Sequence, residues 1–204
     1  MVKRLITIFI LMIISIGILS GCGKNNTEDN AKSQTETVDV SENYDPNNWL
    51  ASLNTTDING NVITSDIFKK YDLTLVNVWT TWCSTCVEEM PVFREIHEGY
   101  KDKGVNIIGV VVELDNSGQQ MKEGLSENER ELAKEIIEQK GLKYTNIITS
   151  KSLLKTQLKD VQAFPTKYFV DKNRKFVGEL ILSSKSKKAW IKTIEEKLQQ
   201  VREK

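Results

Sequence analysis

Short apolar runs and longer amphipathic segments follow one another along the chain. Residues 73–79 and 105–112 are nearly continuous runs of apolar and β-branched side chains, which is typical of strands buried on both faces of a sheet. A helix is predicted between them, over residues 84–100. Because a crossover helix connects the two strands, we expect them to be parallel.

Further elements are predicted on both sides of this unit. Ser126 and Glu129 match a capping box, in which each side chain bonds the backbone N–H of the other residue at a helix start. The other expected elements, in chain order, are a strand over residues 49–53, strands over 56–58 and 61–63 around an Asn59-Gly60 turn, a brief helix over 65–70, a helix over 126–140, a strand over 144–149 and a short helix over 150–159.

The last part of the chain predicts a hairpin and a closing helix. Residues 167–170 and 175–182 are strand-like and flank the polar residues 171–174. An apolar stripe then marks one face of a final helix, formed by Trp190, Ile191, Ile194 and Leu198. The elements together predict an α/β fold with parallel strands first and an antiparallel hairpin last.

The N-terminal segment predicts export. Lys3 and Arg4 precede an apolar run over residues 5–19 and the sequence Leu-Ser-Gly before Cys22, which is the build of a secretory signal. The apolar run is shorter than the roughly 20 residues that a membrane-spanning helix needs. Leu-Ser-Gly-Cys resembles the bacterial lipobox, so residues 1–21 are interpreted as a lipoprotein signal peptide and Cys22 as the lipidated residue; an uncleaved anchor and a simply cleaved signal are the alternatives.

The polar residues 22–45 lack the large apolar side chains that an ordered core requires, so we expect a flexible tether there. Residues 46–204 are left for one folded domain. The chain has 28 basic and 28 acidic residues, and this balance argues against a nucleic-acid partner.

Cys83 and Cys86 form a CxxC motif where the strand over 73–79 gives way to the helix. A structural zinc site needs four ligands, and only His97 could join these two cysteines, so no metal is predicted. Haem attachment would require histidine where Val87 stands. A structural disulfide closing so short a loop would add little stability. The pattern therefore favours thiol-disulfide redox chemistry.

The position of each cysteine predicts its part in that chemistry. Cys83 lies at the helix start, where unpaired backbone N–H groups and the helix dipole stabilise a thiolate. It is therefore expected to attack a disulfide. Cys86, one turn further along, is expected to be more buried and to resolve the mixed disulfide.

Residues 76–91, VNVWTTWCSTCVEEMP, match the pattern N-x-W-x-x-W-C-x-x-C-x-x-E-x-P, and Phe164-Pro165-Thr166 precedes a predicted strand. On these motifs the chain resembles the TlpA/ResA-like thiol-disulfide oxidoreductases, bacterial lipoproteins with a thioredoxin fold. The resemblance implies a central mixed β-sheet flanked by helices, a cis-proline facing the cysteines, and no cofactor. Relatives often have glycine where Arg174 stands, which leaves Asn173 as the residue expected to be left-handed.

The resemblance also implies roles for residues around the cysteines. Glu89 falls on an acidic position associated with control of thiol protonation, although a solvated helix carboxylate is the alternative. Trp82, Phe164 and Pro165 are expected to shape the substrate-binding surface, with the Phe164 backbone able to pair with an extended segment. Asn77 occupies the place of the buried aspartate of thioredoxins. His97 lies several turns from Cys83, and a structural role is expected for it.

The resulting functional prediction is a protein lipid-anchored on the extracytoplasmic face of a bacterial cell membrane that reduces protein disulfides. Its expected electron donor is a membrane thiol transporter of the CcdA or DsbD kind, and its clients include apocytochrome c or a methionine sulfoxide reductase. A disulfide-forming oxidant and a non-catalytic binding lipoprotein are the alternatives. A peroxidase is disfavoured, because Val76 stands where the peroxiredoxin motif has proline.

Overall fold

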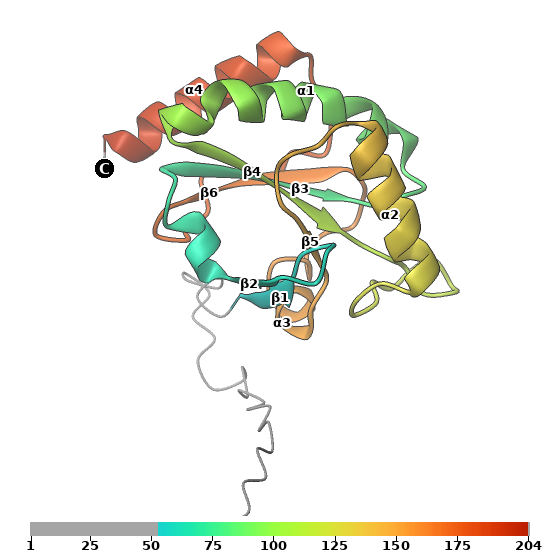
Figure 1. The fold of residues 1–204 in the computed structure, drawn as a ribbon. Helices are drawn as coiled ribbons and strands as arrows, with labels where there is room; N and C mark the ends of the chain where they lie inside the picture. Colours follow the sequence, from blue (N-terminus) through green and yellow to red (C-terminus); the bar gives the residue numbers. More distant parts are fainter. Residues whose placement is uncertain (1–52, 204) are drawn as a thin grey trace, which may run out of the picture. The chain divides into compact units, whose positions relative to one another are not determined.

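A computed structural model describes residues 53–203 of the chain (Figure 1). The predicted signal peptide over residues 1–21, Cys22 and the tether over 22–45 lie outside the described residues. Within 53–203, no helix combines the length and the apolar character needed to cross a membrane.

The described residues contain six strands, four α-helices and two short 3-10 helices. The strands are β1 (Asn54–Thr56), β2 (Val62–Thr64), β3 (Leu73–Trp79), β4 (Val105–Val111), β5 (Asn146–Ile148) and β6 (Thr166–Asp171). The α-helices are α1 (Ser84–Tyr100), α2 (Glu127–Gln139), α3 (Lys151–Lys155) and α4 (Lys187–Arg202), and the 3-10 helices are η3 (Ser65–Phe68) and η4 (Lys101–Lys103).

The central sheet has the strand order β5-β4-β3-β6. β3 and β4 are parallel, as are β4 and β5, whereas β6 runs antiparallel to β3. Every residue of β3 and β4 is buried, because helices or loops cover both faces of these two inner strands. The predicted mixed sheet and the parallel crossover are therefore confirmed.

Side chains of β3 alternate between two apolar cores. Leu73, Leu75 and Trp79 belong to the core beneath α1, α2 and α4, here called the α1 face. Val76 and Val78 point to the opposite core, which contains residues from η3 and α3. Figure 1 shows α1 and α4 side by side over one face of the sheet, with α3 and the β1–β2 hairpin beneath the other.

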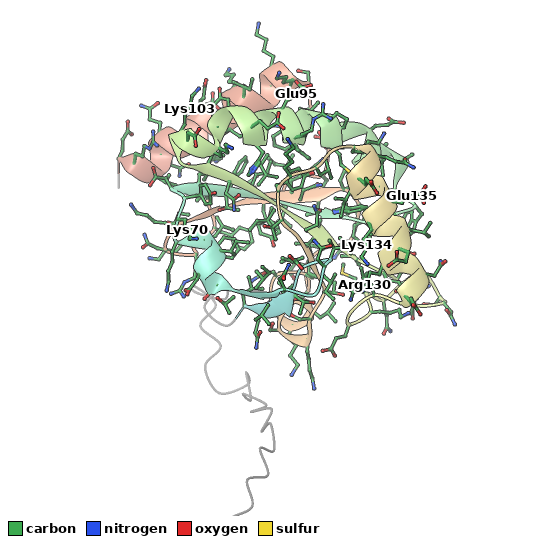
Figure 2. The ribbon with its side chains drawn as sticks, in the orientation of Figure 1. Lys70, Glu95, Lys103, Arg130, Lys134 and Glu135 are labelled. Atoms are coloured by element: carbon green, nitrogen blue, oxygen red, sulfur yellow. A yellow bond between two sulfur atoms is a disulfide. The ribbon has the colours of Figure 1, made fainter. Side chains whose placement is uncertain are left out.

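Most charged residues of the α-helices lie on their outer faces. Glu95 on α1 and Glu135 on α2 point away from the sheet (Figure 2). The inner side of α1 instead buries apolar residues one turn apart, including Met90, Phe93 and Ile96. This amphipathic division fixes which face of α1 meets the sheet, and Cys86 and Glu89 lie on that buried face.

Only half of the predicted capping box at α2 forms. The Ser126 side chain accepts a hydrogen bond from the Glu129 N–H, as predicted. The Glu129 carboxylate instead accepts from the Thr81 hydroxyl, and the Ser126 N–H donates to Glu113 at 2.5 Å. Glu129 therefore connects α2 to the turn that precedes Cys83.

The predicted C-terminal hairpin is looser than expected. β6 is a regular strand, but residues 175–182 contact it only through isolated bridges at Phe176 and Ile181. The left-handed residue of the turn is Arg174, with φ 67°, so the prediction of Asn173 was wrong. The Asn173 N–H donates to the Asp171 carboxylate, and this bond ties Asn173 into the turn one residue before the left-handed position.

Candidate active site

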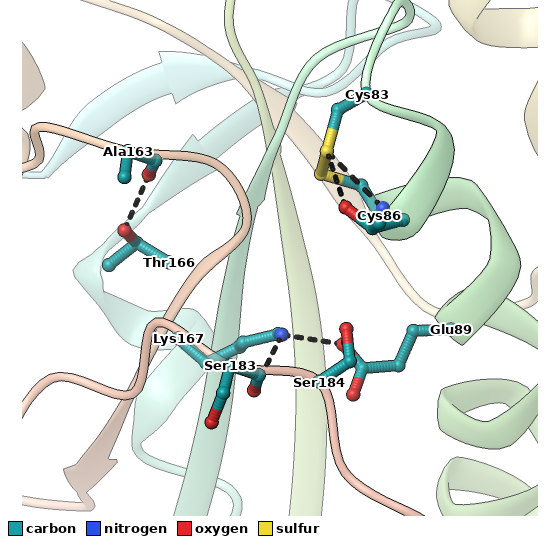
Figure 3. The surroundings of a disulfide bond; sticks show 9 residues. Cys83, Cys86, Glu89, Ala163, Thr166, Lys167, Ser183 and Ser184 are labelled. Atoms are coloured by element: carbon teal, nitrogen blue, oxygen red, sulfur yellow. Dashed lines mark hydrogen bonds and ion pairs between the residues drawn. A yellow bond between two sulfur atoms is a disulfide. The ribbon is translucent and has the colours of Figure 1, made fainter.

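Cys83 and Cys86 are joined by a disulfide at the point where β3 has ended and α1 begins (Figure 3). Their Cα atoms are 5.2 Å apart. The thiols lie one helical turn apart because Cys83 is the N-cap residue of α1 and Cys86 is in its first turn. Local sequence alone therefore brings the two sulfurs together.

The helix start is built to stabilise charge on the Cys83 sulfur. Cys83 Sγ accepts a hydrogen bond from the Cys86 N–H at 3.2 Å and lies 3.5 Å from the Thr85 hydroxyl. In the reduced state the same N–H and the positive end of the helix dipole favour a thiolate. Cys83 keeps 5% of its surface exposed and Cys86 1%, so an attacking group reaches Cys83 more readily.

An aromatic pair includes Trp82, the residue before Cys83. Trp82 is 63% exposed, and its ring meets that of Phe164 edge to face with centroids 5.9 Å apart. The Phe164–Pro165 peptide bond is cis, as the resemblance implied. The turn is held by the Thr166 hydroxyl, which donates to the Ala163 carbonyl at 2.7 Å. Trp82, Phe164 and Pro165 thus come from two loops and lie at one place.

A charged pair is buried below the disulfide on the α1 face. The Lys167 ammonium ion lies 2.5 Å from the Glu89 carboxylate, and their side chains are 0% and 3% exposed (Figure 3). Glu89 also accepts hydrogen bonds from Trp190 Nε1 at 2.7 Å, the Lys185 N–H at 2.8 Å and the Ser184 hydroxyl at 3.3 Å. Burial lowers the pKa of Lys167, while its bond to Glu89 acts in the opposite direction. Glu89 is thus a buried, fully bonded group rather than a solvated helix carboxylate.

Asn77 lies beside this pair. It is opposite Lys167 in the antiparallel register of β3 and β6, and it is fully buried. Neither polar atom of its side chain has a hydrogen-bond partner among the described residues. An uncharged amide therefore occupies the place where, by the resemblance, thioredoxins have an aspartate.

His97 lies near the other end of α1. Its ring contacts that of Tyr144 with centroids 5.9 Å apart, and burial lowers the pKa of the imidazole, with a smaller contribution from Lys101. No cluster of three potential metal ligands occurs within residues 53–203. His97 therefore lies at the end of α1 opposite to the cysteines. This position agrees with the structural role expected for it.

Lys167 was missed by the sequence reasoning, although its position carries a signal. Residues alternate between faces along a strand, so Lys167 shares a face with Phe169, which is fully buried in the core. A lysine at a core-facing position needs a buried partner. Its partner Glu89 is 78 positions earlier in the chain, and the periodicity of one strand cannot identify a partner so far away in sequence.

A sequence model of the redoxin family matches residues 39–188. The chain belongs to the redoxin family. Two curated relatives of this redoxin, both named thiol-disulfide oxidoreductase ResA, come from Bacillus thuringiensis strains Al Hakam and subsp. konkukian 97-27. Each is 32% identical, over 108 residues (52% of this chain and 53% of the relative) and over 127 residues (61% and 63%), respectively. The matched segments thus span between about half and two thirds of the relatives.

A solved structure supports the thioredoxin-like fold of this redoxin. The thiol:disulfide interchange protein of Chlorobium tepidum TLS, a thioredoxin family protein, superposes with a TM-score of 0.59 at 17% identity, covering 72% of this chain and 94% of that one. The fold and the predicted TlpA/ResA-like relationship are confirmed. The roles assigned to Cys83, Cys86, Glu89, Trp82, Phe164 and Pro165 stay predictions, and Cys22 lies outside the described residues.

Proposed function

We propose that this redoxin is a thiol-disulfide oxidoreductase that cycles the Cys83/Cys86 pair between dithiol and disulfide. The observation that carries the proposal is the disulfide at the start of α1, where the Cys83 sulfur accepts the Cys86 N–H. A structural disulfide closing so short a loop would contribute little stability. The same position stabilises the thiolate on which exchange depends.

In the reducing direction, the Cys83 thiolate attacks one sulfur of a partner disulfide and displaces the other sulfur as a thiolate. The Cys86 thiol then loses its proton and attacks Cys83, which closes the intramolecular disulfide and releases the second partner sulfur. Two electrons pass to the partner, whose thiolates take up protons. An external dithiol returns two electrons to the Cys83–Cys86 disulfide.

The partner would bind over the Trp82–Phe164 pair. Trp82 supplies exposed apolar surface, and the segment through Phe164 and Pro165 lies next to it. Trp and Phe are typical anchors of protein interfaces. This surface suits an extended polypeptide that presents its disulfide to Cys83.

The setting and direction are part of the proposal. The lipobox-like sequence before Cys22 favours a lipid anchor on the extracytoplasmic face of a bacterial membrane. The resemblance to TlpA/ResA-like proteins favours reduction of client disulfides, such as those of apocytochrome c or a methionine sulfoxide reductase. Electrons would come from a membrane thiol transporter of the CcdA or DsbD kind.

Trapping in cells tests the exchange chemistry. Cys86→Ser removes the resolving thiol, so mixed disulfides with partners should accumulate on Cys83 and disappear on reduction before electrophoresis. Cys83→Ser is the matched control, because it keeps one buried thiol but removes the attacking one. Equal adduct formation by the two variants, or none by either, would contradict the proposal.

The reduction potential of the pair determines the direction. A value near about −270 mV is that of a reductant, and one near about −120 mV is that of an oxidant. A disulfide that resists dithiothreitol would favour the non-catalytic binding protein. Labelling of Cys22 by a fatty-acid analogue, abolished by Cys22→Ala, tests the anchor separately from the chemistry.

A further inference from the structure

The ion pair between Lys167 and Glu89 is the most unusual group in the described part of the fold. Lysine is almost never fully buried unless it is paired, and the Lys167 side chain has no exposed surface. The free energy needed to remove two charges from water can exceed the free energy gained from their mutual attraction. Because this buried pair lies near the Cys83–Cys86 disulfide, we looked for a role for it in the redox chemistry.

Each member of the pair is attached to a different half of the candidate site. Glu89 is three residues after Cys86 on α1, so its side chain lies one turn from Cys86 on the same helix face. Lys167 is two residues after Pro165, at the start of β6. The pair therefore connects the helix that carries the sulfurs to the strand that follows the cis-proline (Figure 3).

The hydrogen bonds of Glu89 are those of a carboxylate. Lys167, Trp190, the Lys185 N–H and the Ser184 hydroxyl all donate to its two oxygens. Three of these groups can only donate, so a protonated carboxyl could direct its O–H at the Ser184 hydroxyl alone and would have fewer acceptor sites for the other donors. Hydrogen bonds and an opposite charge both favour the ionised form.

Lys167 is in turn held towards Glu89. Its ammonium group donates to the Ser183 carbonyl at 3.3 Å and lies 5.6 Å from the centre of the Trp190 ring. No other carboxylate is paired with it in residues 53–203. The charge of Lys167 is therefore directed at one group, the Glu89 carboxylate.

We propose that Lys167 is a positioning residue of the redox site, whose ammonium ion keeps Glu89 ionised in both the disulfide and the dithiol state. Glu89 then exchanges no proton during the redox cycle, and the sulfurs obtain their protons from the reducing dithiol or from water. The inference rests on the proposed function, because it concerns the protons that accompany reduction of the Cys83–Cys86 disulfide.

The other groups around Glu89 do not replace Lys167. Tyr144 is buried, and burial together with Glu89 raises its pKa, so the phenol stays neutral. Lys185 approaches through its backbone N–H, while its ammonium group lies 5.4 Å from the Trp190 ring and 3.3 Å from the Thr193 hydroxyl. Cys86 becomes a thiol or a thiolate on reduction. Without Lys167, the buried Glu89 carboxylate would have no paired cation one helical turn from Cys86. Burial without an opposite charge disfavours the charged form of a carboxyl group.

The test is the pH dependence of the equilibrium with dithiothreitol. Wild type, Lys167→Met and the double variant Glu89→Gln/Lys167→Met are equilibrated from about pH 5 to about pH 8, between the ordinary titrations of carboxyl and thiol groups. Maleimide labelling then measures the reduced fraction. Lys187→Met is the matched control. Lys187 forms a 2.6 Å ion pair with Glu95, but this pair is exposed and includes neither Glu89 nor Lys167.

Wild type, the double variant and Lys187→Met should have parallel pH profiles. Lys167→Met should show an equilibrium constant that falls more steeply with pH, by up to an extra tenfold per pH unit for one added proton, or about 30 mV for the two-electron couple. The double variant should lose this extra slope, because it lacks the carboxyl that takes the proton.

Three results would overturn the inference: equal slopes for wild type and Lys167→Met, an extra slope retained by the double variant, or an extra slope in Lys187→Met. If Lys167→Met fails to fold, the redox-difference infrared spectrum of wild type decides. A protonated-carboxyl band that appears on reduction and is absent from the double variant would refute the proposal, and its absence from wild type would support it. Failure of wild type to equilibrate with dithiothreitol would instead count against the proposed function.

Discussion

Replacing Lys167 by methionine should destabilise the oxidised protein strongly, because the change removes one charge from a fully buried pair. Breaking such a pair costs about 3–5 kcal/mol, since the remaining charge is left without compensation. Glu89 retains hydrogen bonds from Trp190, the Lys185 N–H and Ser184 after the change. These bonds should keep the loss near the lower end, at about 3 kcal/mol.

The double variant Glu89→Gln/Lys167→Met removes both charges and keeps the approximate side-chain volumes. Its free energy of unfolding should be higher than that of Lys167→Met, because burying a neutral amide costs less free energy than burying an unpaired carboxylate. A double-mutant cycle with Glu89→Gln should therefore give a coupling energy of about 2 kcal/mol. Urea denaturation of the disulfide form at neutral pH measures all four proteins.

The matched cycle uses Lys187 on α4 and Glu95 on α1, which form an ion pair of 2.6 Å on the surface. These side chains are 51% and 45% exposed, so water and salt screen the pair. Its coupling should be indistinguishable from the error of the measurement. Equal coupling in the two cycles, or a Lys167→Met variant as stable as Lys187→Met, would refute the reasoning from burial.

Two further predictions concern His97 and Gly109. His97 is the single histidine of the chain, and its pKa is lowered mainly by burial and secondly by Lys101. In an NMR titration, the imidazole proton resonances should therefore have a midpoint below about 6.5. A midpoint above that value would contradict the role of burial. Because the unfolded state then binds more protons than the native state below this pH, stability should fall as the pH drops through that window, less so in His97→Phe. Gly109→Ala should destabilise by about 1–3 kcal/mol in denaturant unfolding, because its Cβ would lie 1.9 Å from Asn146 Oδ1, which accepts from Trp79.

Much of the fold follows from local patterns. The apolar runs of β3 and β4 and the amphipathic helix α1 were predicted within a residue of their observed bounds. The CxxC pair was found in the same way, because a helix start brings Cys83 and Cys86 together without help from distant residues. Local signals succeed wherever the chemistry depends on neighbours in sequence.

The failures occur where a distant partner decides the outcome. The Glu129 side chain bonds Thr81, 48 positions away, in place of its own helix cap. The strand pattern over residues 175–182 yields only isolated bridges to β6. In each case the local pattern was present, but a tertiary contact or its absence determined the structure.

The buried pair below the disulfide combines both situations. Glu89 was singled out from a local motif, yet two of the groups that bond its carboxylate, Lys167 and Trp190, lie 78 and 101 positions further along the chain. Because these groups also join α1 to β6 and α4, any substitution of Lys167 changes stability and electrostatics together. Loss of packing alone would lower the free energy of unfolding without changing how many protons accompany reduction. A steeper pH profile therefore separates a residue that sets the charge of Glu89 from one that only fills space beneath the sulfurs.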